Sequence, residues 1–157
     1  MKVLGLDPGS RAAGFGVVES VSGRLSLLDC GVWRVAGEDL ACRLDALFRC
    51  AETVLARHSP GAVSVETVFS GRNVASAVAL SHARGVLLLA AARAGVPVFE
   101  YEPLVVKKAL TGYGRAEKPQ VREMVRSLLA SGSRRMPLDA ADALAVAICH
   151  CHHSTGY

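Results

Sequence analysis

Three apolar, strand-forming segments lie within the first 35 residues of this 157-residue chain. They cover residues 3–7, 15–20 and 25–35, and Gly-rich or Ser-Gly turns of hairpin type separate them. Connections this short join antiparallel strands, because parallel strands need a long crossover. The first third of the chain therefore predicts three strands paired in consecutive hairpins.

The rest of the chain alternates helical and strand patterns, with Gly, Pro and Asn at the expected boundaries. The expected order is a helix from about residue 40 that ends at Pro60, a strand over 62–66, a helix over 74–94 between Asn73 and Gly95, a strand over 96–101, a short helix from Pro103, and helices over 119–130 and 137–150. This order predicts an α/β fold with a five-stranded mixed sheet, in which three antiparallel hairpin strands are followed by two parallel strands, flanked by α-helices.

Length and composition favour a single globular domain over residues 1–157. Half of the residues are apolar (51%) and 20% are charged, which excludes a disordered chain. The longest apolar run, residues 86–92, is too short to cross a bilayer, and no cationic leader precedes it. A soluble cytoplasmic protein without membrane contact is expected.

The cysteines indicate reduced thiols. Their number is odd, five, and their spacing does not repeat, so a disulfide scaffold is not favoured. The segment CHCHH at residues 149–153 contains zinc-ligand side chains, but no second ligand pair stands at finger spacing elsewhere. A zinc site is therefore not favoured either.

Two of the predicted strands end on a carboxylate. Asp7 follows the first strand and opens an Asp-Pro-Gly turn, while Glu66 closes the strand over residues 62–66. Asp7 alone has an equally good interpretation as a turn residue. Glu66 has no such role, because glutamate is a poor strand residue. Whether the two side chains point the same way depends on strand pairing, which the sequence does not determine.

The last predicted helix adds a second acidic pair, Asp139 and Asp142. At a spacing of three they share one face, with Cβ atoms about 5–6 Å apart. Every other residue from 140 to 148 is apolar, so this pair interrupts a buried helix. Asp139 alone could be a first-turn acid favoured by the helix dipole. His150 lies eleven residues beyond Asp139, about 16 Å along a helix, and is a poor candidate ligand for the same ion.

Four converging carboxylates would repel one another and raise each other's pKa unless a cation lay among them. Mg²⁺ suits such a site, since it binds a few carboxylates and keeps positions open for water and phosphate. Two ions about 4 Å apart would activate a water and stabilise the leaving oxygen of a phosphodiester. The predicted chemistry is metal-dependent phosphodiester hydrolysis, with Asp7, Glu66, Asp139 and Asp142 as metal ligands and catalytic residues.

Basic and aromatic residues indicate a nucleic-acid surface. If the four acids bind metal, the remaining surface has 18 basic and ten acidic residues, and this excess of positive charge suits the binding of phosphates. Arg115, Lys118, Arg122 and Arg126 recur at steps of three and four, although such stripes are commonly just solvated helix faces. Candidate base-stacking residues are the loop aromatics Phe69 and Tyr113, of which Phe69 is favoured and Tyr113 left open, since loop aromatics often fold back over the core. The predicted DNA contacts are Phe69, Arg72, Asn73, Tyr113, Arg115 and Arg122.

Several segments in order along almost the whole chain resemble the RuvC-type Holliday junction resolvases. The matching segments are LGLDPGSRAAGFGVV, VETVF, HARGVLLLAA, GYGRAEKPQV and DAADALAVAICHCH. The resemblance implies an RNase H-like fold and a homodimer that nicks two strands at a four-way DNA junction with Mg²⁺ or Mn²⁺. It also implies a branch-migration helicase complex of the RuvA and RuvB type as a partner.

The family's acidic tetrad falls on Asp7, Glu66, Asp139 and Asp142, where some members carry His at the third position and this chain has Asp. Lysines that support catalysis or junction binding in the family match Lys107 and Lys118. The aromatic that opens base pairs at the crossover matches Phe69. The segment SGSRRMP matches no motif, so Arg134 and Arg135 receive no role.

Two-fold symmetry of a junction suits a two-fold dimer with one site per subunit. The apolar helix over residues 74–94 is the candidate interface, and a purely buried core helix is its equal alternative.

Three other functions remain open. A nuclease that cuts the RNA strand of a hybrid duplex could use the same acids. A non-catalytic nucleic-acid-binding module would have no use for them. A nucleotide-binding module of the actin and sugar-kinase type shares the Asp-Pro-Gly-Ser turn, but it needs two such domains and 157 residues are too few.

Overall fold

The computed structural model describes residues 1–9, 11–67, 74–130 and 136–154. The strands are β1 (Lys2–Asp7), β2 (Ala12–Val21), β3 (Arg24–Arg34), β4 (Ala62–Glu66) and β5 (Val98–Tyr101). The helices are α1 (Leu40–His58), α2 (Val74–Arg93), α3 (Pro103–Thr111), α4 (Lys118–Leu128) and α5 (Leu138–Ser154).

The five strands form one mixed sheet in the order β3-β2-β1-β4-β5. β1, β2 and β3 pair antiparallel, whereas β4 lies parallel to both β1 and β5. The turn between β2 and β3 consists of Ser22 and Gly23, with φ of 49° and 80°, as a two-residue hairpin turn of type I′ requires. The predicted sheet, with three hairpin strands followed by two parallel strands, is confirmed.

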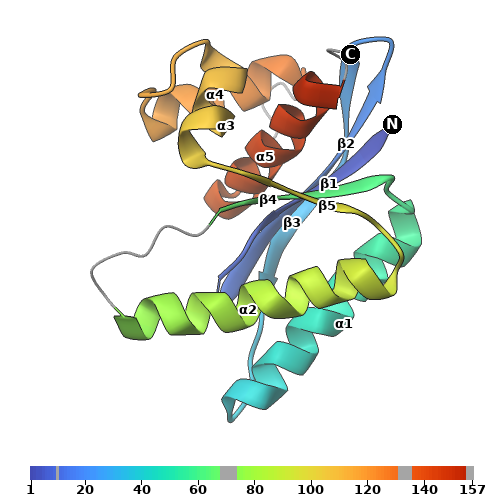
Figure 1. Ribbon diagram of the computed structural model, residues 1–157, viewed down its shortest axis with the longest axis vertical. Helices are drawn as coiled ribbons and strands as arrows, with labels where there is room; N and C mark the ends of the chain where they lie inside the picture. Colours follow the sequence, from blue (N-terminus) through green and yellow to red (C-terminus); the bar gives the residue numbers. More distant parts are fainter. Residues whose placement is uncertain (10, 68–73, 131–135, 155–157) are drawn as a thin grey trace.

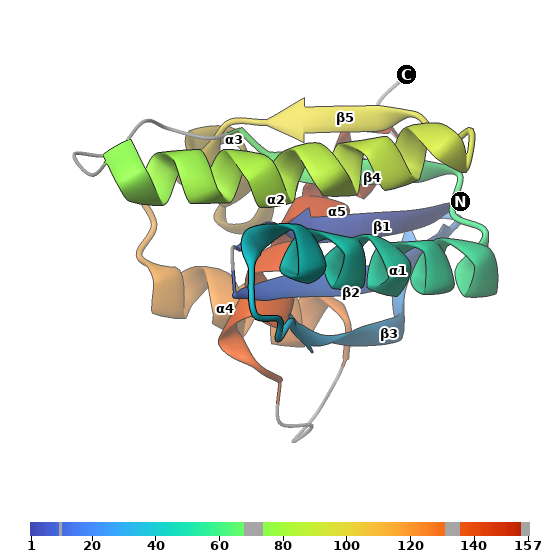
Figure 2. The ribbon, with the colours of Figure 1, turned by 90° about the horizontal axis from the view of Figure 1, so that it is seen from below.

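Helices cover both faces of the sheet (Figures 1 and 2). α1 and α2 lie on one face, over Leu4, Leu6 and the other strand side chains that point the same way. α5, flanked by α3 and α4, lies on the opposite face, over side chains such as Val3 and Val18. Because strand side chains alternate, the even-numbered residues of β1 serve one core and the odd-numbered residues face α5.

Glycines on β1 and β2 allow α5 to lie against the backbone of the sheet. A Cβ atom at Gly5 would come within 2.0 Å of the Ala143 carbonyl oxygen, and one at Gly14 within 2.0 Å of the Asp139 carbonyl oxygen. At Gly16 it would lie 2.4 Å from the Leu144 side chain. Glycine within a strand often marks such a close approach. These three positions therefore fix how near α5 lies to the strands.

Several element boundaries differ from the sequence prediction: β2 begins at Ala12 rather than 15, α4 ends at Leu128 rather than 130, and β5 and α5 also differ. β5 begins at Val98 rather than 96, because the Val96 N–H donates to the Ala91 carbonyl at 3.0 Å and belongs to the end of α2, where Gly95 has φ of 69°. α5 continues to Ser154 rather than stopping near residue 150. Its added turn buries Cys151, and the Ser154 hydroxyl donates to the His150 carbonyl at 2.9 Å.

α2 is long and apolar enough to span a membrane by length and composition alone, with 20 residues and a mean hydropathy of 1.6 over 18 of them. The sequence prediction considered only the uninterrupted run of residues 86–92 and missed this property. The same test is passed by helices that pack in soluble proteins, so it is weak evidence. One side of α2 does pack on the core, through Ala83, Leu87, Ala90 and Ala91. Much of its other side is exposed.

Replacing Gly5 with alanine tests the contact between α5 and the sheet. The added methyl group would overlap the backbone of α5, so we expect Gly5→Ala to lower the free energy of unfolding by about 1–3 kcal/mol or more. Urea denaturation measures the change. Gly61→Ala is the matched control, because the nearest atom to its new Cβ lies 3.8 Å away. Equal stability of the two variants would contradict the proposed tight packing.

Candidate active site

Parallel pairing of β1 and β4 brings two predicted acids to the same edge of the sheet. Leu6 is aligned with Val65, so the next residues, Asp7 and Glu66, end neighbouring strands side by side. Both point to the α5 face of the sheet, away from Leu6 and Val65, which are buried under α1 and α2. The pairing that the sequence left open therefore places the two carboxylates together.

α5 supplies the other two acids from its first turns. Its N-terminus lies over the end of β1, where Asp7 is paired with Gly14 and Gly14 contacts the backbone of Asp139. Asp142 lies one turn further along and is the one residue between Ala140 and Cys151 that is partly exposed rather than buried. The close packing of α5 on Gly14 thus places this acidic pair beside Asp7.

All four acids and both predicted lysines line one pocket of about 210 Å³. α3 contributes Lys107, and α4 contributes Lys118 at its first residue, where the Gln120 side chain accepts a hydrogen bond of 2.9 Å from the Glu117 N–H. The remaining walls are apolar: Val106, Val121, Ala145 and Val146. Five separate elements converge here, so the pocket depends on the whole fold.

The carboxylates in this pocket destabilise each other's charge. Burial, together with the nearby Asp142, Asp139 and Glu66, raises the pKa of Asp7 from its ordinary value of 3.8 to about 7. Burial and Asp142 also raise the pKa of Glu66, against the opposing effect of Lys118 and Lys107. The pocket therefore favours either a bound proton or a cation.

Asp142 has two cationic neighbours within the protein. The Arg122 guanidinium lies 3.3 Å from its carboxylate, and the Lys118 ammonium lies 3.7 Å away. The Arg122 side chain is only 19% exposed, and its Nε has no hydrogen-bond partner among the described residues.

Across the described part of the chain, no three His, Cys, Asp or Glu side chains are grouped closely enough to hold one metal ion.

The predicted DNA contacts lie in different places. Arg122 lies beside Asp142 rather than on an open surface, so its predicted contact with DNA stays a prediction. Tyr113 and Arg115 line another pocket, on the far side of α3. Phe69, Arg72 and Asn73 fall outside the described residues.

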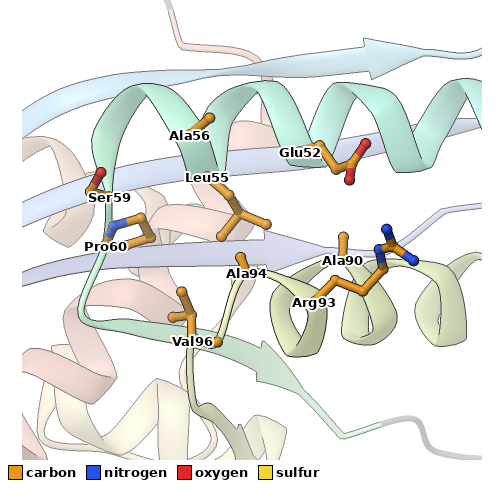
Figure 3. A pocket seen from close by; sticks show the side chains of 10 residues that line it. Glu52, Leu55, Ala56, Ser59, Pro60, Ala90, Arg93, Ala94 and Val96 are labelled. Atoms are coloured by element: carbon orange, nitrogen blue, oxygen red, sulfur yellow. The ribbon is translucent and has the colours of Figure 1, made fainter.

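A larger pocket, of about 580 Å³, lies between the C-terminal ends of α1 and α2 (Figure 3). It is on the sheet face opposite the acids and brings together Glu52, Arg93 and mostly apolar or small residues. With a single carboxylate, it offers no basis for the chemistry that the four acids predict.

The Cys-His tail forms part of α5 and lies away from the acids. The His150 ring is buried against Phe99 and forms a 2.7 Å hydrogen bond with the Tyr101 hydroxyl. Burial raises the pKa of Cys149 to about 12 and that of Cys151 to about 11, so both thiols stay protonated. None of the five cysteines, all within the described residues, is in a disulfide.

Residues 3–150 match the family model for the crossover junction endodeoxyribonuclease RuvC. The RuvC protein of Pelotomaculum thermopropionicum is 47% identical over 156 residues, which cover 99% of this chain and 95% of that protein. The chain belongs to the RuvC family. A RuvC protein of Heliobacterium modesticaldum is 51% identical over 155 residues, with 98% and 95% of the two chains covered.

A solved RuvC structure shows the same fold. Thermus thermophilus RuvC in complex with a Holliday junction substrate superposes with a TM-score of 0.91 and 38% identity, over 98% of this chain and 94% of that one. The fold is therefore RNase H-like, and the family resemblance stated from the sequence is confirmed.

The sequence interpretation missed two features of the site. One is the ion pair between Arg122 and Asp142, because the helical spacing of Arg122 with Lys118 did not indicate that it lies against an acid. The other is the set of glycines under α5, for which a signal existed: Gly14 and Gly16 stand two residues apart within a strand, so both lack a side chain on the same face.

The raised pKa of Asp7 predicts a stability effect that depends on pH. Between pH 3.8 and about 7 the folded state holds a proton that the unfolded state has released, so ionising Asp7 lowers stability progressively as pH rises through this window. Asparagine cannot ionise. We therefore expect Asp7→Asn to raise the Tm at pH 8 in the presence of a chelator, by on the order of 5 °C, and to lose most of this gain at pH 4.5.

Thermal denaturation at the two pH values measures this difference. Asp45→Asn is the control, since Asp45 is exposed and its ion pair, among the residues that the structure describes, is with Arg49 on the surface of α1. A Tm gain for Asp7→Asn that is the same at both pH values would show that the Asp7 carboxylate is not strained by its surroundings.

Proposed function

We propose that this protein is a structure-selective endonuclease that resolves four-way DNA junctions by paired, symmetric phosphodiester hydrolysis in recombination and repair. One observation carries the proposal: in a chain of the RuvC family, four acids and two lysines from five elements line a single pocket. The homologue bound to a Holliday junction substrate supports the choice of substrate.

We further propose that the pocket binds Mg²⁺, two ions per site, with Mn²⁺ able to substitute. Asp7, Glu66, Asp139 and Asp142 would hold the metal, because carboxylate oxygens are the ligands that Mg²⁺ prefers. The donor set fits by its chemistry, since burial and mutual repulsion raise the pKa values of Asp7 and Glu66, and a bound cation would offset both. No three of the described acids lie close enough together for one ion, so metal binding would draw the carboxylates closer. When bound, the metal supplies an activated water and stabilises the leaving oxygen.

The basic residues around the acids have distinct roles in this proposal. Lys107 and Lys118 line the pocket and would hold the scissile phosphate by direct charge-assisted hydrogen bonds. Arg122 is largely buried and would orient the Asp142 carboxylate. Arg122 therefore serves as a positioning residue, and the lysines contact the substrate.

We propose that the active form is a homodimer in which α2 meets its counterpart. Large apolar side chains on the exposed side of α2 include Val78 and Leu89, 49% and 54% exposed. Gly85 lies between them and faces open space, so another helix could approach closely. A two-fold dimer would present one acid pocket to each of two symmetry-related strands of the junction.

The remaining expectations stay predictions. They are a single nuclease domain over residues 1–157, a cytoplasmic location, and assembly with a branch-migration helicase complex of the RuvA and RuvB type. They follow from the family membership and the DNA substrate.

Cleavage of a synthetic four-way junction tests the proposed activity. We expect paired symmetric nicks in the junction with Mg²⁺, none with a chelator, and none in matched linear DNA or RNA/DNA hybrid duplexes. Asp7→Asn should reduce cleavage on the order of 100-fold or more while binding to the junction persists, because asparagine keeps the shape but loses the charge.

Asp45→Asn controls for a general effect of removing a carboxylate and should cut like the wild type. Equal cutting of linear duplex would overturn the junction assignment, and preferential cutting of the hybrid would favour the RNA-strand hydrolase. Loss of binding by a folded Asp7→Asn variant would mean that Asp7 is structural.

Placing a charge on α2 tests the dimer. We expect Leu89→Glu to convert a dimer into a monomer in light-scattering measurements, because two like charges would be buried at the two-fold interface. Leu28→Glu, at an exposed leucine on β3, is the control and should remain dimeric. A dimer that survives Leu89→Glu would place the interface elsewhere.

A further inference from the structure

α3 borders a second pocket besides the acid pocket, the one that Tyr113 lines. Its volume is about 520 Å³, and it lies against the face of α3 that is turned away from the acids. Leu104, Val105 and Lys108 form its wall on α3, and the loop from Gly112 to Arg115 closes it. Two of its side chains are large, apolar and mostly exposed: Leu104 is 57% exposed and Tyr113 is 60% exposed. The pocket thus combines an apolar surface with two basic side chains, Lys108 and Arg115.

The loop that carries Tyr113 is held in place by hydrogen bonds. The Thr111 hydroxyl donates to the Lys107 carbonyl at 2.8 Å and accepts from the Tyr113 N–H at 3.2 Å. Gly112 has φ of 75° and donates its N–H to the Lys108 carbonyl at 2.9 Å, which caps α3. The aromatic ring is therefore presented to solvent by a fixed backbone instead of folding back over the core.

The charge at this pocket suits a nucleic-acid strand. Lys108 and Arg115 are both exposed, and neither forms an ion pair with any residue that the structure describes. The described lining contains no acidic residue. An apolar and aromatic surface beside two free cations matches a base with its flanking phosphate.

α3 lies between this pocket and the acid pocket and forms a wall of both. Lys107 lines the acid pocket and the next residue, Lys108, lines the second pocket. A strand whose phosphate is held at Lys107 can therefore pass over α3 to Lys108. The nucleotide that reaches the second pocket would belong to the strand that is cut.

We propose that this pocket is a nucleotide subsite. It takes a base that is unstacked from the cleaved strand near the cut, stacks it on Tyr113, and holds the flanking phosphate with Lys108 and Arg115. This inference rests on the proposed junction-cutting function. It adds a binding site for an unpaired base outside the acid pocket.

Binding to junctions that lack single bases tests the subsite. In the Asp7→Asn background with a chelator, which suppresses cutting, Tyr113→Ala should weaken binding to the intact junction roughly 5- to 150-fold, as expected for loss of one base stack. Tyr113→Phe keeps the ring and should bind like its parent. On the junction whose abasic position is the base that stacks, Tyr113→Ala should cause no further loss.

Salt dependence gives a second readout. Lys108→Ala and Arg115→Ala should each reduce the slope of log affinity against log salt by about 1. Phe99→Ala, at an exposed aromatic on β5, is the matched control for Tyr113→Ala and should leave junction binding unchanged.

The outcomes separate the subsite from the proposed function. If the wild type cuts junctions but Tyr113→Ala binds as tightly as its parent, the subsite is overturned alone. An equal loss for Tyr113→Ala on every abasic junction also overturns it, because the ring would then contact no base. If the wild type neither binds nor cuts junctions, the proposed function itself falls.

Discussion

The close packing of α5 on the glycine-lined face of β1 and β2 is the contact on which the rest of the structure depends. The helix is buried along almost its whole length between the sheet and the pair α3 and α4, so its position sets theirs. Gly5 and Gly14 let its backbone touch the strands, and Gly14 lies directly opposite Asp7. The contact that builds this core is therefore the same contact that brings Asp139 and Asp142 to Asp7.

The packing of α5 gathers four acids in one pocket, and this gathering has an electrostatic cost. Burial beside the other acids disfavours the charged form of Asp7 and raises its pKa to about 7. The protein offsets part of this cost with Lys118 and Arg122, both on Asp142, and leaves Asp7 and Glu66 without a salt bridge among the described residues. A site that is unfavourable when empty of cations binds them more readily, so stability is exchanged for function at this point.

Much of the fold and of the acid pocket was predictable because both depend on local patterns. Short turns force the hairpins, and each of the four acids interrupts an apolar segment where a charge is out of place. Strand pairing was not predictable, since β4 reaches β1 only after the nineteen-residue helix α1. The inward turn of Arg122 was also hidden, because helical spacing gives a residue's face but not what packs against that face. Whether α2 is buried all round or exposed on one side was left open for a related reason: a uniformly apolar helix carries no amphipathic pattern to show which side is buried.

The division between a rigid acid pocket and the α3 to α4 loop has a consequence for how such an enzyme can change. Any side chain at position 14 would displace α5 and move Asp139, so the chemistry cannot be adjusted through the strands without disturbing the fold. Position 113 is different, because the hydrogen bonds that fix its loop come from Thr111 and the backbone, not from the tyrosine ring. Substitutions at position 113 would change which junctions bind tightly without changing the residues that carry out hydrolysis. For protein engineering, the loop is the adjustable part and the glycine face is the part to leave alone.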